Sequence, residues 1–108
     1  MKKLLFVCSE NRLRSPTAEV IFSKYNGIKA IGCGTNKDAK TPISGKLIEW
    51  ADIVIVMEKH HRNKILSNFK HLLKGKRFIC LDIPDKYGFM QPELVNLLKV
   101  KVSKYGIL

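Results

Sequence analysis

The chain of 108 residues has few of the features that mark several large classes of protein. Its three cysteines, Cys8, Cys33 and Cys80, are too few and too far apart for a disulfide framework or a Cys-x-x-Cys metal motif. No apolar run approaches the roughly 20 residues of a transmembrane helix. The short apolar run after Met1 ends at Ser9, too early for a signal peptide. We therefore expect one domain, residues 1–108, in a reducing cytoplasmic compartment and without a membrane partner.

Acidic residues are also scarce. Nine Asp and Glu stand against 20 Lys and Arg, which gives a net charge of +11. Residues 59–81, called the basic span here, contain no acidic residue at all. Such a charge attracts anionic substrates and could meet an acidic partner. Nucleic acid is not expected as a ligand, because the span lacks the regular aromatic interleaving of a stacking platform.

A metal site is not expected from the two adjacent histidines. On a helix His60 and His61 diverge by about 100°, so they cannot share an ion as an i, i+4 pair does. We expect both to be exposed polar residues. The sequence predicts neither a metal nor another cofactor.

The most informative stretch begins with an apolar strand of residues 3–7, which ends at Cys8. Five residues separate Cys8 from Arg14, and Ser15 and Pro16 follow at once. A short loop from a strand to the start of a helix turns its backbone N–H groups inward and so forms an anion site. The guanidinium of Arg14 matches two phosphate oxygens. The stretch therefore predicts a phosphate-binding loop.

Each residue type in this loop fits a role in phosphate chemistry. The positive field favours the nucleophilic thiolate form of Cys8. Ser15 either caps the helix, with Pro16 at its first position, or donates to the Cys8 sulfur. Asn11 tolerates a left-handed backbone. The simpler alternative is that Cys8 is a buried thiol at the end of a strand.

At these positions the chain resembles the low-molecular-weight protein tyrosine phosphatases, for which it is short. The resemblance covers nearly the whole chain and is carried by Val7-Cys8, Asn11 and residues 14–19, Arg-Ser-Pro-Thr-Ala-Glu. Three positions in or beside this loop depart from the family. Glu10 replaces a glycine, Leu13 replaces a second loop cysteine, and Gly32 replaces a serine, so one hydrogen bond that supports the loop is expected to be missing.

Alternating strands and helices predict an α/β protein with a parallel sheet covered on both faces. The resemblance implies a three-layer sandwich of the flavodoxin-like, phosphotyrosine protein phosphatase I-like type, with four strands in the order 2-1-3-4. The expected strands are residues 3–7, 28–33, 52–57 and 78–81, and the expected helices are residues 16–25, 43–51, 58–73 and 92–105.

The proton donor is expected in the loop after the fourth strand, because ligands of an open parallel sheet bind beyond the carboxyl ends of its strands. The resemblance implies an aspartate followed by an aromatic residue. Asp85 and Tyr87 fit best, with Lys86 in place of a proline, and Asp82 is the rival acid. One carboxyl group can protonate the leaving oxygen and then activate water.

Taken together, these residues predict a phosphomonoesterase that hydrolyses aryl phosphates such as phosphotyrosine, in a protein or a small molecule, through a phosphocysteine. Glu10 is expected to point to solvent and Arg12 to face the entrance. Alternatives are a non-catalytic module that binds phosphorylated partners, an arsenate reductase, and a phosphoarginine phosphatase. The expected catalytic residues are Cys8, Arg14 and Asp85, and the expected substrate-binding residues are Ser9, Glu10, Asn11, Arg12, Leu13, Ser15 and Tyr87.

A redox role is a further hypothesis. In the strand order 2-1-3-4, Cys33 at the end of the second strand neighbours Cys8, so it is a candidate resolving thiol. The alternative is that Cys33 is a small buried residue.

Overall fold

A computed structural model describes all residues, 1–108. The elements are the strands β1 (Lys2–Cys8), β2 (Ile28–Gly34), β3 (Ile53–Val56) and β4 (Arg77–Cys80), the helices α1 (Arg14–Phe22), α2 (Gly45–Trp50), α3 (Lys59–Phe69) and α4 (Pro92–Lys104), and the 3₁₀ helix η1 (Lys70–Leu72). No helix combines the length and the hydropathy that a membrane span requires.

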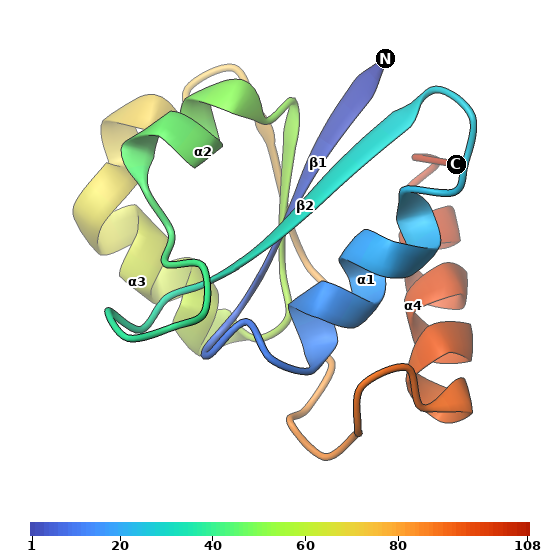
Figure 1. Ribbon diagram of the computed structural model, residues 1–108. Helices are drawn as coiled ribbons and strands as arrows, with labels where there is room; N and C mark the ends of the chain where they lie inside the picture. The colour runs from blue at the N-terminus through green and yellow to red at the C-terminus, as the bar shows by residue number, and fades with distance from the viewer.

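The four strands form one parallel sheet in the order β2-β1-β3-β4, as the sequence predicted. In Figure 1, α1 and α4 lie on one side of the sheet and α2 and α3 on the other. A parallel sheet needs this cover because each crossover connection places a helix on a face. The three-layer α/β sandwich is therefore confirmed.

The two sheet faces divide the core into two clusters, because successive side chains of a strand point to opposite faces. Leu4, Phe6 and Cys8 of β1 belong to the larger cluster, which includes residues of α1 and α4. Leu5 and Val7 belong to the smaller cluster, which α2 and α3 cover. Phe6 stacks on Phe22 of α1 with ring centroids 5.3 Å apart, on the face that carries Cys8.

The first helix begins two residues earlier than predicted, at Arg14 rather than Pro16. Pro16 is therefore the third helical residue, where the missing N–H costs nothing because first-turn N–H groups have no intrahelical partner. Ser15 lies inside the helix and does not cap it. The helix also ends at Phe22 instead of residue 25, because the chain turns there into Gly27, whose φ is +80°.

The helices predicted at 43–51 and 58–73 are also shorter in the structure, and η1 follows the second of them. Helix α2 begins at Gly45 because Ser44 is its N-cap and accepts a hydrogen bond from the Leu47 N–H (3.3 Å). Helix α3 begins at Lys59, with Glu58 at the N-cap and His61 completing a capping box. These capping residues place α3 directly behind the predicted phosphate-binding loop.

Candidate active site

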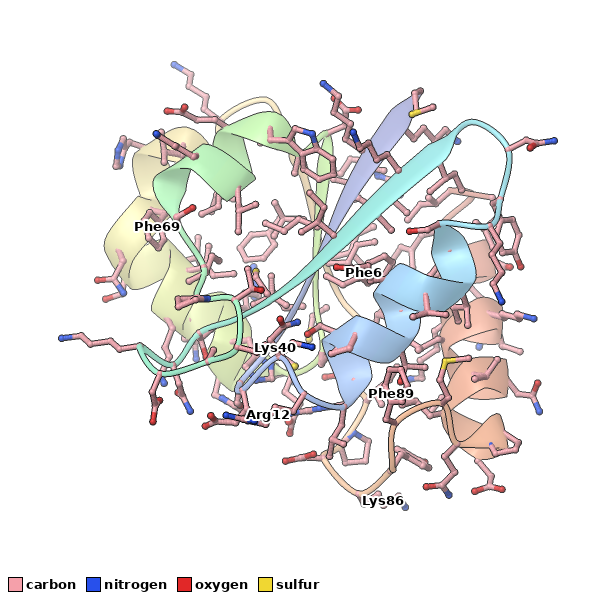
Figure 2. The ribbon with its side chains drawn as sticks, in the orientation of Figure 1. Phe6, Arg12, Lys40, Phe69, Lys86 and Phe89 are labelled. Atoms are coloured by element: carbon pink, nitrogen blue, oxygen red, sulfur yellow. The ribbon has the colours of Figure 1, made fainter.

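The loop between β1 and α1 forms a cavity of about 190 Å³ at the carboxyl edge of the sheet. Pockets for drug-sized ligands usually measure about 300–1,000 Å³, so this one suits a small group such as a phosphoryl group. In Figure 2, Arg12 from this loop and Lys86 from the loop after β4 both lie at the lower edge of the molecule. The cavity is lined by Cys8, Ser9, Glu10, Arg12, Leu13, Arg14 and Asp85.

Hydrogen bonds fix the sulfur of Cys8 at this cavity. Its Sγ lies 2.9 Å from the Ser15 Oγ, and the Asn11 Nδ2 donates to the same hydroxyl at 2.7 Å. The Ser15 proton thus has two acceptors, the Cys8 sulfur and the Cys33 carbonyl oxygen at 3.1 Å. The Ser15 hydroxyl is therefore within hydrogen-bond distance of the sulfur. Of the two roles predicted for Ser15, the structure shows the contact with Cys8.

The loop owes its path to one residue in a left-handed conformation. Asn11 has a φ of +56°, a conformation that its residue type tolerates, and its side chain is buried. Because Asn11 holds Ser15 and Ser15 contacts Cys8, this conformation is coupled to the position of the sulfur.

Arg14 is almost completely buried, with 2% of its surface exposed. Its Nη1 donates to the Glu58 carboxylate and to the Ile83 carbonyl oxygen (2.9 Å), while Nε lies 3.8 Å from the Asp85 Oδ1. The Nη2 makes no hydrogen bond. Nε and Nη2 therefore remain as the pair of donors that can meet a phosphate, and Nη1 anchors the guanidinium.

Glu58 is a site residue that the sequence analysis missed. Burial favours a raised pKa, but the hydrogen bonds and charges of Arg14 and His60 outweigh it and lower the pKa of Glu58. The carboxylate is therefore ionised at neutral pH and balances the buried guanidinium. Only its place directly after β3, at the same sheet edge as Cys8, was a signal in the sequence.

His61 was also missed, and its predicted exposure is wrong. The side chain is fully buried, with its Nε2 2.8 Å from the Ser9 Oγ and its Nδ1 3.0 Å from the Glu58 N–H. His60 is largely exposed, as expected.

Nitrogen and oxygen atoms of Glu58, His60 and His61 lie within 4.8 Å of one another, a spacing that suits a metal. Both nitrogens of His61 are engaged in hydrogen bonds, however, and Glu58 is paired with Arg14.

Two glycines of β2 let the loop pack closely. A Cβ on Gly32 would lie 2.8 Å from the Ser15 carbonyl oxygen and 2.9 Å from the Asn11 Nδ2. A Cβ on Gly34 would lie 2.4 Å from the Ser9 carbonyl oxygen. The glycine at position 32, where the resemblance implies a serine, thus allows a direct approach of Asn11. Asn11 in turn bonds Ser15, and the Gly32 N–H donates to the Glu19 Oε1 (2.6 Å).

The two candidate acids lie in different places. Asp85 lines the cavity with Cys8, whereas Asp82 lines a separate hollow beside Glu58 and His60. Asp82 has a φ of +55°, and its Oδ1 accepts from the Cys80 Sγ at 3.5 Å. Geometry therefore favours Asp85 as the acid.

The predicted substrate-binding residues divide into two groups. Ser9, Arg12 and Leu13 line the cavity, as does Glu10, whose carboxylate accepts a hydrogen bond from the Asn36 side chain rather than pointing freely to solvent. Tyr87 is not among the lining residues. Its ring packs against the larger core cluster with the Lys86 Nζ 5.6 Å from its centroid, because the loop turns back toward α4.

The structure does not support the proposed pairing of Cys8 with Cys33. Cys33 is paired with Val7 in the sheet register and lies in the smaller cluster, whereas Cys8 lies in the larger cluster on the other face. Burial also raises the pKa of the Cys33 thiol far above its usual value, which suppresses the reactive thiolate. No second thiol lines the cavity, so the arsenate reductase alternative, which needs thiols in reach of Cys8, lacks support.

No protein-family model matches the chain, and no curated protein sequence is significantly similar to it. Solved structures do match. The Wzb protein of Vibrio vulnificus, in complex with benzylphosphonate, is 20% identical with a TM-score of 0.76 and 96% of each chain covered.

Two further matches have similar scores. The arginine phosphatase YwlE of Geobacillus stearothermophilus is 18% identical, with a TM-score of 0.73 over 100% of this chain and 98% of that one. The low-molecular-weight protein tyrosine phosphatase SP-PTP of Streptococcus pyogenes is 15% identical, with a TM-score of 0.72 over 97% and 91%. The chain thus has the fold of the low-molecular-weight protein tyrosine phosphatases, as the resemblance implied.

Proposed function

We propose that the protein is a cysteine-dependent phosphomonoesterase that hydrolyses aryl phosphates such as phosphotyrosine. The observation that carries this proposal is the cavity itself, in which a hydrogen-bonded cysteine sulfur, a buried arginine and an aspartate meet. The matched solved structures include a tyrosine phosphatase and an arginine phosphatase, which supports the same chemistry.

In the first step, the Cys8 thiolate attacks phosphorus in line with the leaving oxygen. The S–P bond forms as the P–O bond breaks, and Asp85 transfers its proton to the leaving oxygen. The backbone N–H groups of the loop and the free Nε and Nη2 of Arg14 hold the equatorial oxygens of the transition state. The products are the free phenol or alcohol and a phosphocysteine.

In the second step, the Asp85 carboxylate takes a proton from water, whose oxygen attacks phosphorus. The S–P bond breaks, inorganic phosphate leaves, and the Cys8 thiolate and protonated Asp85 are restored. The Ser15 hydroxyl, 2.9 Å from the sulfur, stabilises the departing thiolate. The cycle therefore needs only water beyond the substrate.

The size of the cavity supports a substrate whose phosphoryl group enters alone. A volume of about 190 Å³ accommodates the phosphoryl group and the start of its ester, so the rest of the substrate lies outside. The part of the substrate outside the cavity then contacts Glu10, Arg12 and Leu13. Phosphoarginine is the second candidate substrate, because one matched structure is an arginine phosphatase. Comparing kcat/KM for phosphotyrosine and phosphoarginine peptides decides between them.

The basic span provides a second surface, where we propose that an acidic segment of a phosphorylated protein docks. A groove of about 810 Å³ lies between α3, η1 and β4, with Leu66 and Phe78 among its apolar residues and Lys70 and Lys74 among its charged ones. Lys70→Glu with Lys74→Glu should raise KM for acidic phosphopeptides and leave kcat for p-nitrophenyl phosphate unchanged. Equal KM values for acidic and neutral peptides would contradict docking.

Turnover of p-nitrophenyl phosphate tests the main proposal. We expect a burst of p-nitrophenol in the wild-type protein, no turnover in Cys8→Ser, and normal turnover in the control Cys80→Ser, because Cys80 is away from the cavity. A wild-type protein that binds phosphate without any turnover would instead be a binding module.

We also propose that the protein is located in the reducing cytoplasm, because its three cysteines are free thiols. Imaging of the tagged full chain tests this location.

A further inference from the structure

The contact between Ser9 and His61 is not used by the mechanism above. Ser9 directly follows the nucleophile and lines the cavity, and its Oγ lies 2.8 Å from the Nε2 of His61. His61 comes from the first turn of α3 and is fully buried. The role of His61 depends on which of its two ring nitrogens carries the proton.

Backbone geometry makes that assignment. The Glu58 N–H can only donate, and it points at the His61 Nδ1 over 3.0 Å, so Nδ1 is an acceptor without a proton. Burial first, and then the positive charges of His60 and Arg14, lower the pKa of His61 to about 3. The ring is therefore neutral at physiological pH, with its one proton on Nε2.

The tautomer fixes the direction of the next hydrogen bond. His61 donates from Nε2 to the Ser9 Oγ, so it cannot take a proton from Ser9 and this pair is not a second nucleophile with its base. The hydroxyl proton of Ser9 must point away from His61. Cys8 already has the Ser15 hydroxyl as its partner, and Ser9 makes no hydrogen bond to the sulfur.

We propose that the Ser9 hydroxyl donates a hydrogen bond to a nonbridging oxygen of the bound phosphoryl group, and that His61 is the positioning residue that turns this donor into the cavity. This inference rests on the proposed function for its substrate. It adds one side-chain donor to the backbone amides and Arg14. A hydrogen bond to a charged acceptor corresponds to an effect of about 10- to 100-fold on phosphate affinity.

Four variants separate positioning from support of the fold. Ser9→Ala removes the donor and Ser9→Thr keeps it. His61→Asn places an acceptor near Nδ1 and loses the donor to Ser9, whereas His61→Gln places an amide N–H near Nε2. We expect Ser9→Ala and His61→Asn each to weaken inorganic phosphate binding, measured by calorimetry, about tenfold or more. We expect Ser9→Thr and His61→Gln to recover most of it.

The double variant Ser9→Ala/His61→Asn gives the decisive comparison. If His61 acts through Ser9, the double variant binds phosphate with the same affinity as Ser9→Ala alone. Both affinities are corrected for the fraction of folded protein, measured in a thermal melt. Wild-type affinity in Ser9→Ala would overturn the inference. So would a changed rate of Cys8 alkylation by iodoacetamide with unchanged phosphate affinity, because the hydroxyl would then serve the sulfur.

The readout also separates this inference from the proposed function. Phosphate binding is measured without turnover, so the loss in Ser9→Ala can appear even in a protein that hydrolyses nothing. Conversely, a wild-type protein that turns over p-nitrophenyl phosphate, with Ser9→Ala identical in kcat, KM and phosphate affinity, would retain the phosphatase proposal and refute the role of Ser9.

Discussion

Two loops meet at the cavity, and they are built in opposite ways. In the loop after β1 and the first turn of α1, the polar residues Asn11, Arg14 and Ser15 are at most 4% exposed. Asn11 donates a hydrogen bond to Ser15, and Arg14 donates to Glu58 and to the Ile83 carbonyl oxygen. In the loop after β4, the side chain of Asp85 is 60% exposed, and its neighbours Pro84 and Lys86 are exposed as well. The half of the site that we propose binds phosphate is therefore preorganised, whereas the half that we propose donates the proton is solvated.

The exposed loop is nevertheless fixed at both ends. Ile83 is fully buried, its N–H donates to the Met57 carbonyl oxygen (2.8 Å) and its own carbonyl oxygen accepts from Arg14. At the other end, the Met90 N–H donates to the Thr17 Oγ1 (3.0 Å) in α1. Both anchors are contacts with elements that also carry the phosphate-binding loop, so Asp85 is placed relative to Cys8 by the same framework.

The largest effect should come from the preorganised loop. Arg14→Lys keeps the charge but loses the planar fork that bonds Glu58 and Ile83 while leaving two donors free. We expect kcat for p-nitrophenyl phosphate to fall about 10³-fold, the upper range for loss of one preorganised transition-state donor. Lys86→Arg, an exchange of cations on the exposed loop, should leave kcat within about twofold.

With p-nitrophenyl phosphate as substrate, substitution of Asp85 should lower kcat less than Arg14→Lys does, because the effect of a proton donor depends on the leaving group. Asp85→Asn removes the proposed proton donor. Such a donor typically raises the rate about 10²–10⁴-fold when the leaving group is poor. We expect a far smaller effect on kcat for p-nitrophenyl phosphate, because p-nitrophenol leaves without protonation. The matched control is Asp82→Asn. If kcat across a series of substituted phenyl phosphates falls more in Asp82→Asn than in Asp85→Asn, then Asp82 is the proton donor.

Gly32→Ala tests how tightly the preorganised loop is packed. The added Cβ would meet the Ser15 carbonyl oxygen at 2.8 Å, so α1 and the loop must shift. Overpacking of this kind typically lowers the free energy of unfolding by about 1–3 kcal/mol. Chemical denaturation measures the loss, and Gly88→Ala is the control, because the added Cβ would meet no atom closer than 3.8 Å and φ is outside the left-handed region, as at Gly32.

The pH dependence of stability should report the buried His61. Its pKa is about 3 in the folded protein and about 6.5 when unfolded, so between these values the unfolded chain binds the extra proton. The free energy of unfolding should thus rise with pH through this window, by about 1.4 kcal/mol per pH unit around pH 5. At that pH Glu58, whose pKa is lowered from 4.5, is still ionised in the folded protein. His61→Gln should flatten the slope, and an unchanged slope would contradict the assignment.

The smallest effect is expected at Tyr87. Its ring packs on the core and does not line the cavity, so Tyr87→Ala should cost stability while changing kcat/KM for aryl phosphates by less than about threefold. A large rise in KM confined to aryl substrates would restore the predicted role of Tyr87 at the rim and would show that the exposed loop rearranges on binding.

Local signals predicted much of this architecture. The apolar runs predicted all four strands, and the spacing of Cys8, Arg14 and Ser15 predicted the loop with its left-handed Asn11. The helix boundaries were predicted less well than the elements themselves. Helix α1 begins at Arg14 because the loop itself passes into the first turn, and no residue type marks that point.

The sequence by itself determined the α/β fold class and placed Cys8 and Arg14 on one short loop after β1, because hydrophobic periodicity, turn residues and short spacings depend on neighbours in the chain. Only the tertiary structure decided which groups complete the site. Glu58 reaches Arg14, and His61 reaches Ser9, across 44 and 52 positions of sequence. Parallel strands bring their carboxyl ends to one edge whatever the separation along the chain, so such partners are found only when the strands are placed side by side.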